Sequence, residues 1–334
     1  MPLRTYLLTR YIKSAGKYLR AWLPEVDKEE WVVPNASLKD PLRMGEVVEI
    51  VSVQPISEAY RQGIGLCEGV ISVERPGFML TPSGAERKGL QPARQGEKVI
   101  YYLLGGGYNV GHPIRYPFAW QMSQSLQSRL FSLNYRQVLN ASSAFPAPVL
   151  DALAGYLYLT DSLHFEPQNI LLTGDSAGGH LCLALSRYMH DLTPSLAQTG
   201  QIALDSPWCD WTSSFPSRKA NKAYDYLHSD SSDLSITSAM RHYKTQAKGD
   251  MYFSPALTGS GGFDYLVEEG VQVYVQLGTK EVLCDEVRAL VTSLERDGVR
   301  VKLTEVGDLA IGGSIVAELS LPMLFGVDQR WAAC

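Results

Sequence analysis

Three features are missing from this sequence: a cysteine pattern, a strong charge and a long apolar run. The five cysteines have no CxxC spacing, so neither a metal site nor a disulfide framework is expected. A net charge of -5 is weak for 334 residues and no strongly basic face is evident, so nucleic acid is not an expected partner. Gly105 to Gly107 lack the G-x-G-x-x-G spacing of a dinucleotide site, and no cofactor is expected.

The opening residues, 1–23, are interrupted by charge every few positions and contain no apolar stretch long enough for a signal peptide or a membrane span. A cytoplasmic protein is therefore expected. Apolar residues at helical spacing and a run of basic ones predict an amphipathic helix here. Such a helix either lies on a membrane surface or covers an active site with its basic side in water. We favour the covering helix, because only this helix is basic and the sequence after it turns acidic.

Short apolar runs alternate with longer helical stretches from Lys98 onward. Runs that are apolar on both faces are typical of buried parallel strands, and the alternation is typical of a doubly wound α/β sheet. Edge strands are expected before this region, at 46–53 and 69–73. The main strands are expected at 98–104, 129–135, 169–174, 201–208, 271–278 and 299–306, and the helices at 119–127, 147–160, after Ser176 and at 284–297.

One domain accounts for the whole chain. Residues 1–50 are expected to form a helical cap segment and residues 51–334 the core. The stretch at about 213–250 is polar and helical in pattern. We predict that it is a cap insertion over the carboxyl ends of the strands.

A serine lies where an apolar strand meets a helix, in the stretch Gly174-Asp175-Ser176-Ala177-Gly178. This is a G-x-S-x-G motif in the strand-turn-helix context that such a nucleophile requires. Small neighbours allow the strained turn that projects the serine oxygen from the top of the sheet. We therefore predict that Ser176 is a nucleophile.

A glycine-rich turn directly follows the strand at 98–104. Such turns supply backbone N–H groups to the oxyanion that forms during acyl transfer. The predicted donors are Gly106 and Gly107, together with the N–H of Ala177.

Seven pieces of the sequence resemble the hormone-sensitive-lipase-like branch of the α/β-hydrolases. They are YYLLGGGY, LNYR, FPAPVLDALAGYLYL, NILLTGDSAGGHL, SPWCDW, FSPAL and LGTKEVLCDE, and they span about residues 99–307. The resemblance implies an α/β-hydrolase fold with a mostly parallel sheet and a helical cap. It also implies a Ser-Asp-His triad whose acid is Asp285, although an acidic residue there can equally cap the following helix. The glycine turn of that branch begins with histidine, and here Leu104 stands in its position.

The third member of the triad has no counterpart. A histidine should follow Asp285 in a loop after the last strand, but the equivalent loop has Ala310 or Ile311 in its position. An alkyl side chain cannot accept the serine proton. All of the histidines precede Asp285: His112, His164, His180, His190, His228 and His242.

Several other residues are candidates for the proton chemistry or for an apolar pocket. His112, after the glycine turn, and His180, on the nucleophile helix, are candidate bases. Further acid or base candidates are Asp175, Glu281, Asp308 and tyrosines such as Tyr108, although Asp175 is favoured as structural. Pocket candidates are Leu104, Tyr108, His112, Trp208, Trp211, Ala310 and Ile311; for the two tryptophans core packing fits equally well.

Without the histidine, we expect an enzyme that keeps the hydrolase pocket but not hydrolysis. The reaction would be a cyclisation, pericyclic reaction, isomerisation or lyase step on an apolar carbonyl-containing natural product in secondary metabolism. One alternative is a slow or rewired carboxylesterase that uses Ser176. Another is a small-molecule binding protein similar to the gibberellin receptors, which also lack this histidine. The sequence leaves open the substrate and product, and whether the chain forms a homodimer.

Overall fold

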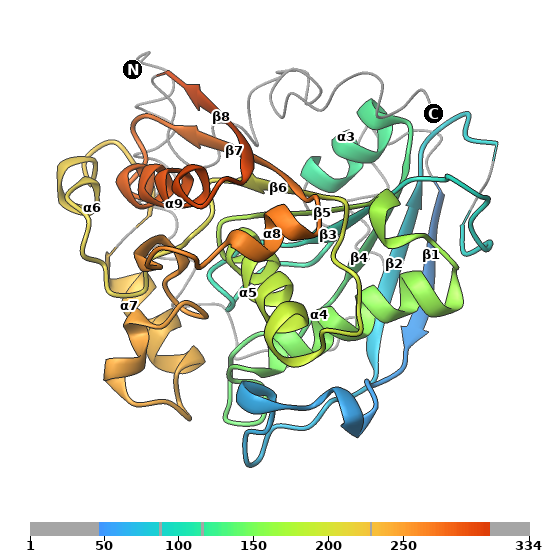
Figure 1. Cartoon of the computed structure of the whole chain (residues 1–334), viewed down its shortest axis with the longest axis horizontal. Coiled ribbons are helices and arrows are strands. Elements are labelled where there is room, and N and C mark those ends of the chain that lie inside the picture. The colour runs from blue at the N-terminus through green and yellow to red at the C-terminus, as the bar shows by residue number, and fades with distance from the viewer. Residues whose placement is uncertain (1–46, 87–88, 115–116, 228, 308–334) are drawn as a thin grey trace.

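An eight-stranded sheet organises the chain (Figure 1). The computed structural model describes residues 47–86, 89–114, 117–227 and 229–307. The strands lie in the order β1-β2-β4-β3-β5-β6-β7-β8; β2 is antiparallel to both neighbours, and β3 to β8 run parallel. This confirms the predicted mostly parallel sheet. The strands are β1 Val47–Val53, β2 Arg75–Thr81, β3 Val99–Leu103, β4 Arg129–Leu133, β5 Ile170–Asp175, β6 Gln201–Asp205, β7 Gln272–Gly278 and β8 Arg300–Val306.

Helices cover both faces of the sheet. Crossovers between parallel strands are almost always right-handed. The step from β3 to β4 runs through the sheet in the direction opposite to the steps from β4 to β5, β5 to β6 and β7 to β8. Helix α3 therefore covers one face, and α4, α5 and α9 cover the other, in front of the sheet in Figure 1. The helices are α3 Pro117–Leu126, α4 Ala147–Leu157, α5 Ala177–Leu192, α6 Ser217–Ala220, α7 Ser229–Ala239, α8 Asp264–Glu268 and α9 Cys284–Arg296. Short 3-10 helices span Glu58–Tyr60, Gly63–Gly65, Pro167–Asn169, Thr245–Gly249 and Pro255–Leu257, and Tyr158–Ser162 forms a π turn.

One expected strand, at 69–73, is not a strand. The N–H of Val70 donates to Cys67 O in a turn, and the hydroxyl of Ser72 accepts from Ile56 N–H. The partner of β1 is instead β2, in which Arg75 pairs with Val53. Val70 is buried in this turn whereas Ile71 is 58% exposed, so the apolar run does not mark a place in the sheet.

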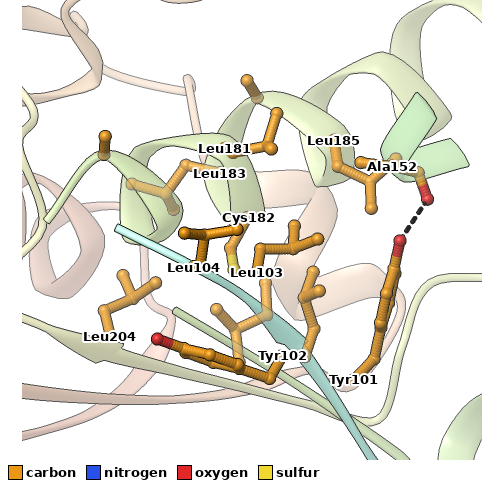
Figure 2. Packing of buried hydrophobic residues seen from close by; sticks show 14 of the residues in the cluster. Tyr101, Tyr102, Leu103, Leu104, Ala152, Leu181, Cys182, Leu183, Leu185 and Leu204 are labelled. Atoms are coloured by element: carbon orange, nitrogen blue, oxygen red, sulfur yellow. Dashed lines mark hydrogen bonds between the residues drawn. The ribbon is translucent and has the colours of Figure 1, made fainter. Parts of the chain in front are cut away.

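The core lies between the sheet and the helices. Figure 2 shows Tyr101 directed from β3 toward α4, where its hydroxyl donates to Ala152 O at 2.7 Å. Leu181 and Leu185 of α5 pack over the same strand, fully buried. Each such leucine contributes roughly 2 kcal/mol through burial. Strand β5 pairs with β3 in the sheet. Packing of α5 over β3 therefore also holds the end of β5, from which Ser176 projects.

The structure describes only one of the two predicted cap segments. The N-terminal segment, up to residue 46, lies outside the described residues. The stretch at 213–250 contains α6, α7 and a 3-10 helix, and its role as a cap stays a prediction. Helix α6 is attached to α9 through Ser217 and Arg218, whose guanidinium lies 3.1 Å from Glu286.

None of the helices within the described ranges combines the length and the apolar character needed to cross a membrane.

Candidate active site

Ser176 occupies a strained turn between β5 and α5. Its backbone has φ 49° and ψ -118°, a sparsely populated conformation that costs roughly 1–3 kcal/mol. The neighbours impose it: Ser176 N–H donates to Asp205 O at 2.9 Å, and Ser176 O accepts from the N–H groups of His180 and Trp208. Its hydroxyl makes no hydrogen bond to another described residue. Ser176 is thus half-buried at the amino end of a helix, and its hydroxyl is not hydrogen-bonded to another described residue.

Glycines on both sides of Ser176 allow the chains to pass closely. A Cβ at Gly178 would overlap Leu103 O, and one at Gly174 would overlap the backbone of Gly178. Both obstacles are backbone atoms, which cannot rotate away. Helix α5 therefore begins directly against the end of β3, where its amino end directs positive potential at Ser176.

Asp175 ties the nucleophile turn to the glycine turn. Its Oδ1 accepts from Gly105 N–H at 2.9 Å and from the Tyr102 hydroxyl at 2.7 Å. Burial raises the pKa of Asp175, and these two hydrogen bonds oppose that rise. Both lone-pair directions on this oxygen have partners, so Asp175 acts as a structural link.

Gly106 and Gly107 both have left-handed backbone conformations, with φ 113° and 61°. A Cβ at Gly106 would overlap Val110 O, so only glycine fits there. The N–H groups of Gly106 and Gly107 donate to no other described residue. Their role as oxyanion donors stays a prediction.

Helix α7 of the predicted insertion reaches this glycine turn. The Asn109 side chain donates to the Ser235 hydroxyl at 2.6 Å, and Ser235 is buried. A Cβ added to Gly107 would lie 3.1 Å from the same hydroxyl. The insertion therefore packs beside the predicted oxyanion donors.

Asp285 lies in a different setting from Ser176. Its Oδ2 accepts from Ser217 N–H at 2.8 Å, and its Oδ1 lies 3.7 Å from Arg288. The side chain is 34% exposed, in the first turn of α9. No hydrogen bond links it to Ser176 in the described part of the chain. In this structure Asp285 ties α6 to α9.

Glu281, four residues earlier, is the buried carboxyl of the same segment. It follows β7 directly and is 1% exposed, and its Oε2 has no hydrogen-bond partner among the described residues. Burial raises its pKa well above the usual range, the nearby Ser206 hydroxyl opposes that rise, and the carboxylates of Asp205 and Asp225 add to it. Asp205 O also holds the Ser176 N–H, so Glu281 lies beside the strand end that positions the nucleophile.

The two candidate histidine bases are buried and make no hydrogen bond to the Ser176 hydroxyl. The Nδ1 of His180 lies 2.6 Å from the Tyr108 hydroxyl, and its ring stacks on Trp211 at 4.8 Å. Burial lowers the pKa of His180 to about 3, so the ring stays neutral at working pH. His112 is 2% exposed and packs against Phe78 at 4.9 Å. Neither imidazole bonds to Ser176.

The remaining described histidines lie in other surroundings. His190 stacks on Tyr265, and the Nε2 of His242 lies 2.7 Å from Ala141 O. His164 has φ 58° at the end of a π turn and is exposed. His228 lies outside the described residues. None of the three described rings is hydrogen-bonded to Ser176.

The pocket candidates that the structure describes are packed in the interior. Trp208 and Trp211 stack at 5.4 Å, and Trp211 lies 6.0 Å from Tyr108. Leu104 and all three of these rings are at most 4% exposed. The three rings form a buried aromatic cluster with His180 of α5. Ala310 and Ile311 lie outside the described residues, as does Asp308.

Comparison with known proteins identifies the family to which this chain belongs. A family model for the alpha/beta hydrolase fold matches residues 100–312. The chain is 31% identical over 232 residues to an acetyl-hydrolase of Streptomyces hygroscopicus, covering 69% of this chain and 73% of that one. It is 26% identical over 234 residues to an esterase of Acinetobacter venetianus, covering 68% and 70%. A solved esterase of the bacterial hormone-sensitive lipase family superposes with a TM-score of 0.70 at 20% identity, covering 100% of this chain and 97% of that one.

These findings correct the expected function. The curated relatives are named as an acetyl-hydrolase and esterases, which contradicts a cyclase-like or other non-hydrolytic reaction in secondary metabolism. That expectation gave the absent histidine more weight than the retained nucleophile turn. The resemblance to hormone-sensitive-lipase-like enzymes, in contrast, is confirmed. The chain belongs to the α/β-hydrolase-fold family.

Proposed function

We propose that the protein is a carboxylesterase that forms an acyl-enzyme on Ser176. One observation carries the proposal: the Ser176 hydroxyl has no hydrogen-bond partner among described residues although its strained backbone is fixed by three hydrogen bonds. A fold keeps such strain where it serves a function. The names of the relatives, acetyl-hydrolase and esterase, support the same reaction.

In the first half-reaction, Ser176 Oγ attacks the ester carbonyl carbon and the alcohol leaves with a proton. Water then attacks the acyl-serine and releases the acid. The carbonyl oxygen becomes negative in both steps, and the N–H groups of Gly106, Gly107 and Ala177 are the donors that would receive it. One such donor is worth roughly 3–4 kcal/mol of barrier lowering.

We assign the acidic side chain of this site to Glu281 rather than to Asp285. The assignment rests on burial and on the partners of each carboxyl group. Glu281 is buried and has an unengaged Oε2, whereas Asp285 is partly exposed and bound to Ser217. Glu281 was one of the acids named from the sequence. The resemblance had instead implied Asp285 as the acid of the triad.

The proton acceptor is proposed to be solvent. The sequence has no histidine after Asp285, and no described imidazole is bonded to Ser176. Deprotonation by water or hydroxide leaves the oxyanion donors and substrate binding as the sources of catalysis. These two contributions alone give roughly 1,000- to 10,000-fold acceleration over water in serine hydrolases.

The test is turnover of p-nitrophenyl acetate and butyrate by wild type and Ser176→Ala. We expect a wild-type rate above the buffer blank that is lower in Ser176→Ala, because the acyl-enzyme can no longer form. Ser142→Ala is the matched control, since Ser142 is exposed and lies in a loop. Equal turnover in Ser176→Ala and wild type would contradict the proposal, and so would a folded wild type without turnover.

A further inference from the structure

Tyr108 is the residue that ends the glycine turn, and its backbone is unusual. It has φ 63°, a left-handed conformation that aromatic side chains rarely adopt. The side chain is 1% exposed, and the backbone oxygen of Tyr108 accepts from Val138 N–H at 2.8 Å. Both the main chain and the ring of Tyr108 are therefore fixed by contacts outside the turn.

The Tyr108 hydroxyl joins the glycine turn to the nucleophile helix. It lies 2.6 Å from Nδ1 of His180, a residue of α5. His180 in turn donates its backbone N–H to Ser176 O at 3.1 Å. A single residue, His180, thus connects the end of the glycine turn to the backbone of the nucleophile.

The other end of the glycine turn is tied to the nucleophile turn. Gly105 N–H donates to the side chain of Asp175, the residue before Ser176. Gly106 and Gly107 therefore lie between two ties, one on each side of the nucleophile. Glycine backbones have more conformational freedom than any other residue, so the direction of their N–H groups depends on what holds the ends.

The Tyr108–His180 hydrogen bond does not titrate in the working range. Burial lowers the pKa of His180 to about 3 and raises the pKa of Tyr108 well above its usual range. Both groups are neutral, and His180 is stacked on Trp211. The pair is suited to holding geometry and not to carrying protons.

We propose that Tyr108 is a positioning residue for ester hydrolysis. Its hydrogen bond to His180 fixes the N–H groups of Gly106 and Gly107 toward the carbonyl oxygen of an ester on Ser176. This inference rests on the proposed carboxylesterase function. It differs from simple core packing, which requires the Tyr108 ring but not its hydroxyl.

The experiment measures kcat and KM for p-nitrophenyl butyrate in Tyr108→Phe. Positioning of oxyanion donors affects the transition state more than substrate binding, so we expect kcat to fall roughly tenfold or more with KM changed less than about twofold. Tyr156→Phe is the matched control: Tyr156 is buried on α4, and its hydroxyl donates to Ala197 O at 2.6 Å. We expect its kcat to equal that of wild type.

A second pair of variants keeps the test valid if Tyr108→Phe folds poorly. In His180→Asn, a side-chain oxygen can accept from the Tyr108 hydroxyl, whereas His180→Leu offers no acceptor. We expect His180→Asn to retain kcat within about threefold and His180→Leu to match Tyr108→Phe. The Tyr108→Phe/His180→Leu double variant should then lose no more than either single variant, since both remove the same bond.

The inference is overturned if kcat of Tyr108→Phe equals that of Tyr156→Phe, or if the losses in the double variant add. Its failure is distinct from failure of the proposed function. An inactive wild type contradicts the carboxylesterase assignment. An active wild type with unchanged Tyr108→Phe contradicts only the positioning role.

Discussion

Two carboxyl groups four residues apart, Glu281 and Asp285, have very different surroundings. Glu281 is buried beside Asp205 and Ser206, and Asp285 is partly exposed against Ser217 and Arg288. Both follow the same strand, so sequence position alone suits either as the acid. The three-dimensional structure distinguishes the two residues. Glu281 faces the interior near Asp205 of β6, whereas Asp285 accepts a hydrogen bond from Ser217 of α6.

At this scale we predict that Glu281→Gln lowers kcat/KM for p-nitrophenyl butyrate roughly tenfold or more, because it removes the buried carboxyl group beside the site. Asp285→Asn is the matched variant and should stay within about threefold of wild type, with a small loss of thermal stability from the weaker bond to Ser217. The steady-state kinetics of both variants check this. Equal losses in the two would contradict the assignment of Glu281.

Glu281 also predicts a pH dependence of stability. Its raised pKa means that the folded state binds this proton more tightly than the unfolded state, whose carboxyl titrates near ~4.3. Wild type therefore loses stability as pH rises above that value, and the non-titrating Glu281→Gln variant does not. The Tm of Glu281→Gln minus the Tm of wild type should therefore increase from pH 4 to pH 8. A constant difference would show that Glu281 has an ordinary pKa.

At the scale of elements, the junction of β3, β5 and α5 explains why the nucleophile projects where it does. The three meet within backbone contact, because glycine stands at 174 and 178. The strain at Ser176 is compensated by the hydrogen bonds that this close approach allows. Burial of Leu181 and Leu185 against β3 keeps the helix in place.

We predict that Gly178→Ala destabilises the protein by roughly 1–3 kcal/mol, because the new methyl group would overlap Leu103 O and force α5 away from β3. Urea unfolding measures the change. Gly249→Ala is the control, since no atom lies within 4 Å of the position that its methyl group would take, and its change should stay within about 0.5 kcal/mol. An equal effect in both variants would mean that α5 does not depend on this contact.

The sequence predicted the elements of this junction well and their neighbours less well. The six parallel strands and the nucleophile helix were predicted within a few residues, because continuous apolar runs and the G-x-S-x-G turn mark them locally. The strand expected at 69–73 was wrong, since pairing with β1 is a long-range choice. The Tyr108–His180 bond joins residues 72 positions apart, which no local pattern reveals.

At the scale of the whole molecule, the carboxyl edge of the sheet brings distant residues to one place. Ser176 follows β5, Glu281 follows β7, and the glycine turn follows β3. Helix α7, from the predicted insertion, packs on that turn through Ser235. The resemblance implies that the family's histidine would stand at Ala310 or Ile311, which lie outside the described residues.

Placing a histidine there should convert a slow esterase into a faster one. We predict that one of Ile311→His and Ala310→His raises kcat/KM for p-nitrophenyl butyrate roughly 100-fold or more, because it supplies a general base. Its rate should level off above pH ~6.5, whereas the wild-type rate should keep rising with pH. The other variant is the matched control. A gain in neither variant would contradict solvent as the present proton acceptor.

The most direct test of the central claim is the intact mass of wild type and Ser176→Ala after incubation with a fluorophosphonate. We predict one adduct per wild-type chain, located on Ser176 by peptide fragmentation, and none in the variant. Ester turnover by wild type without an adduct on Ser176 would contradict the claim, as would a folded wild type with neither adduct nor turnover.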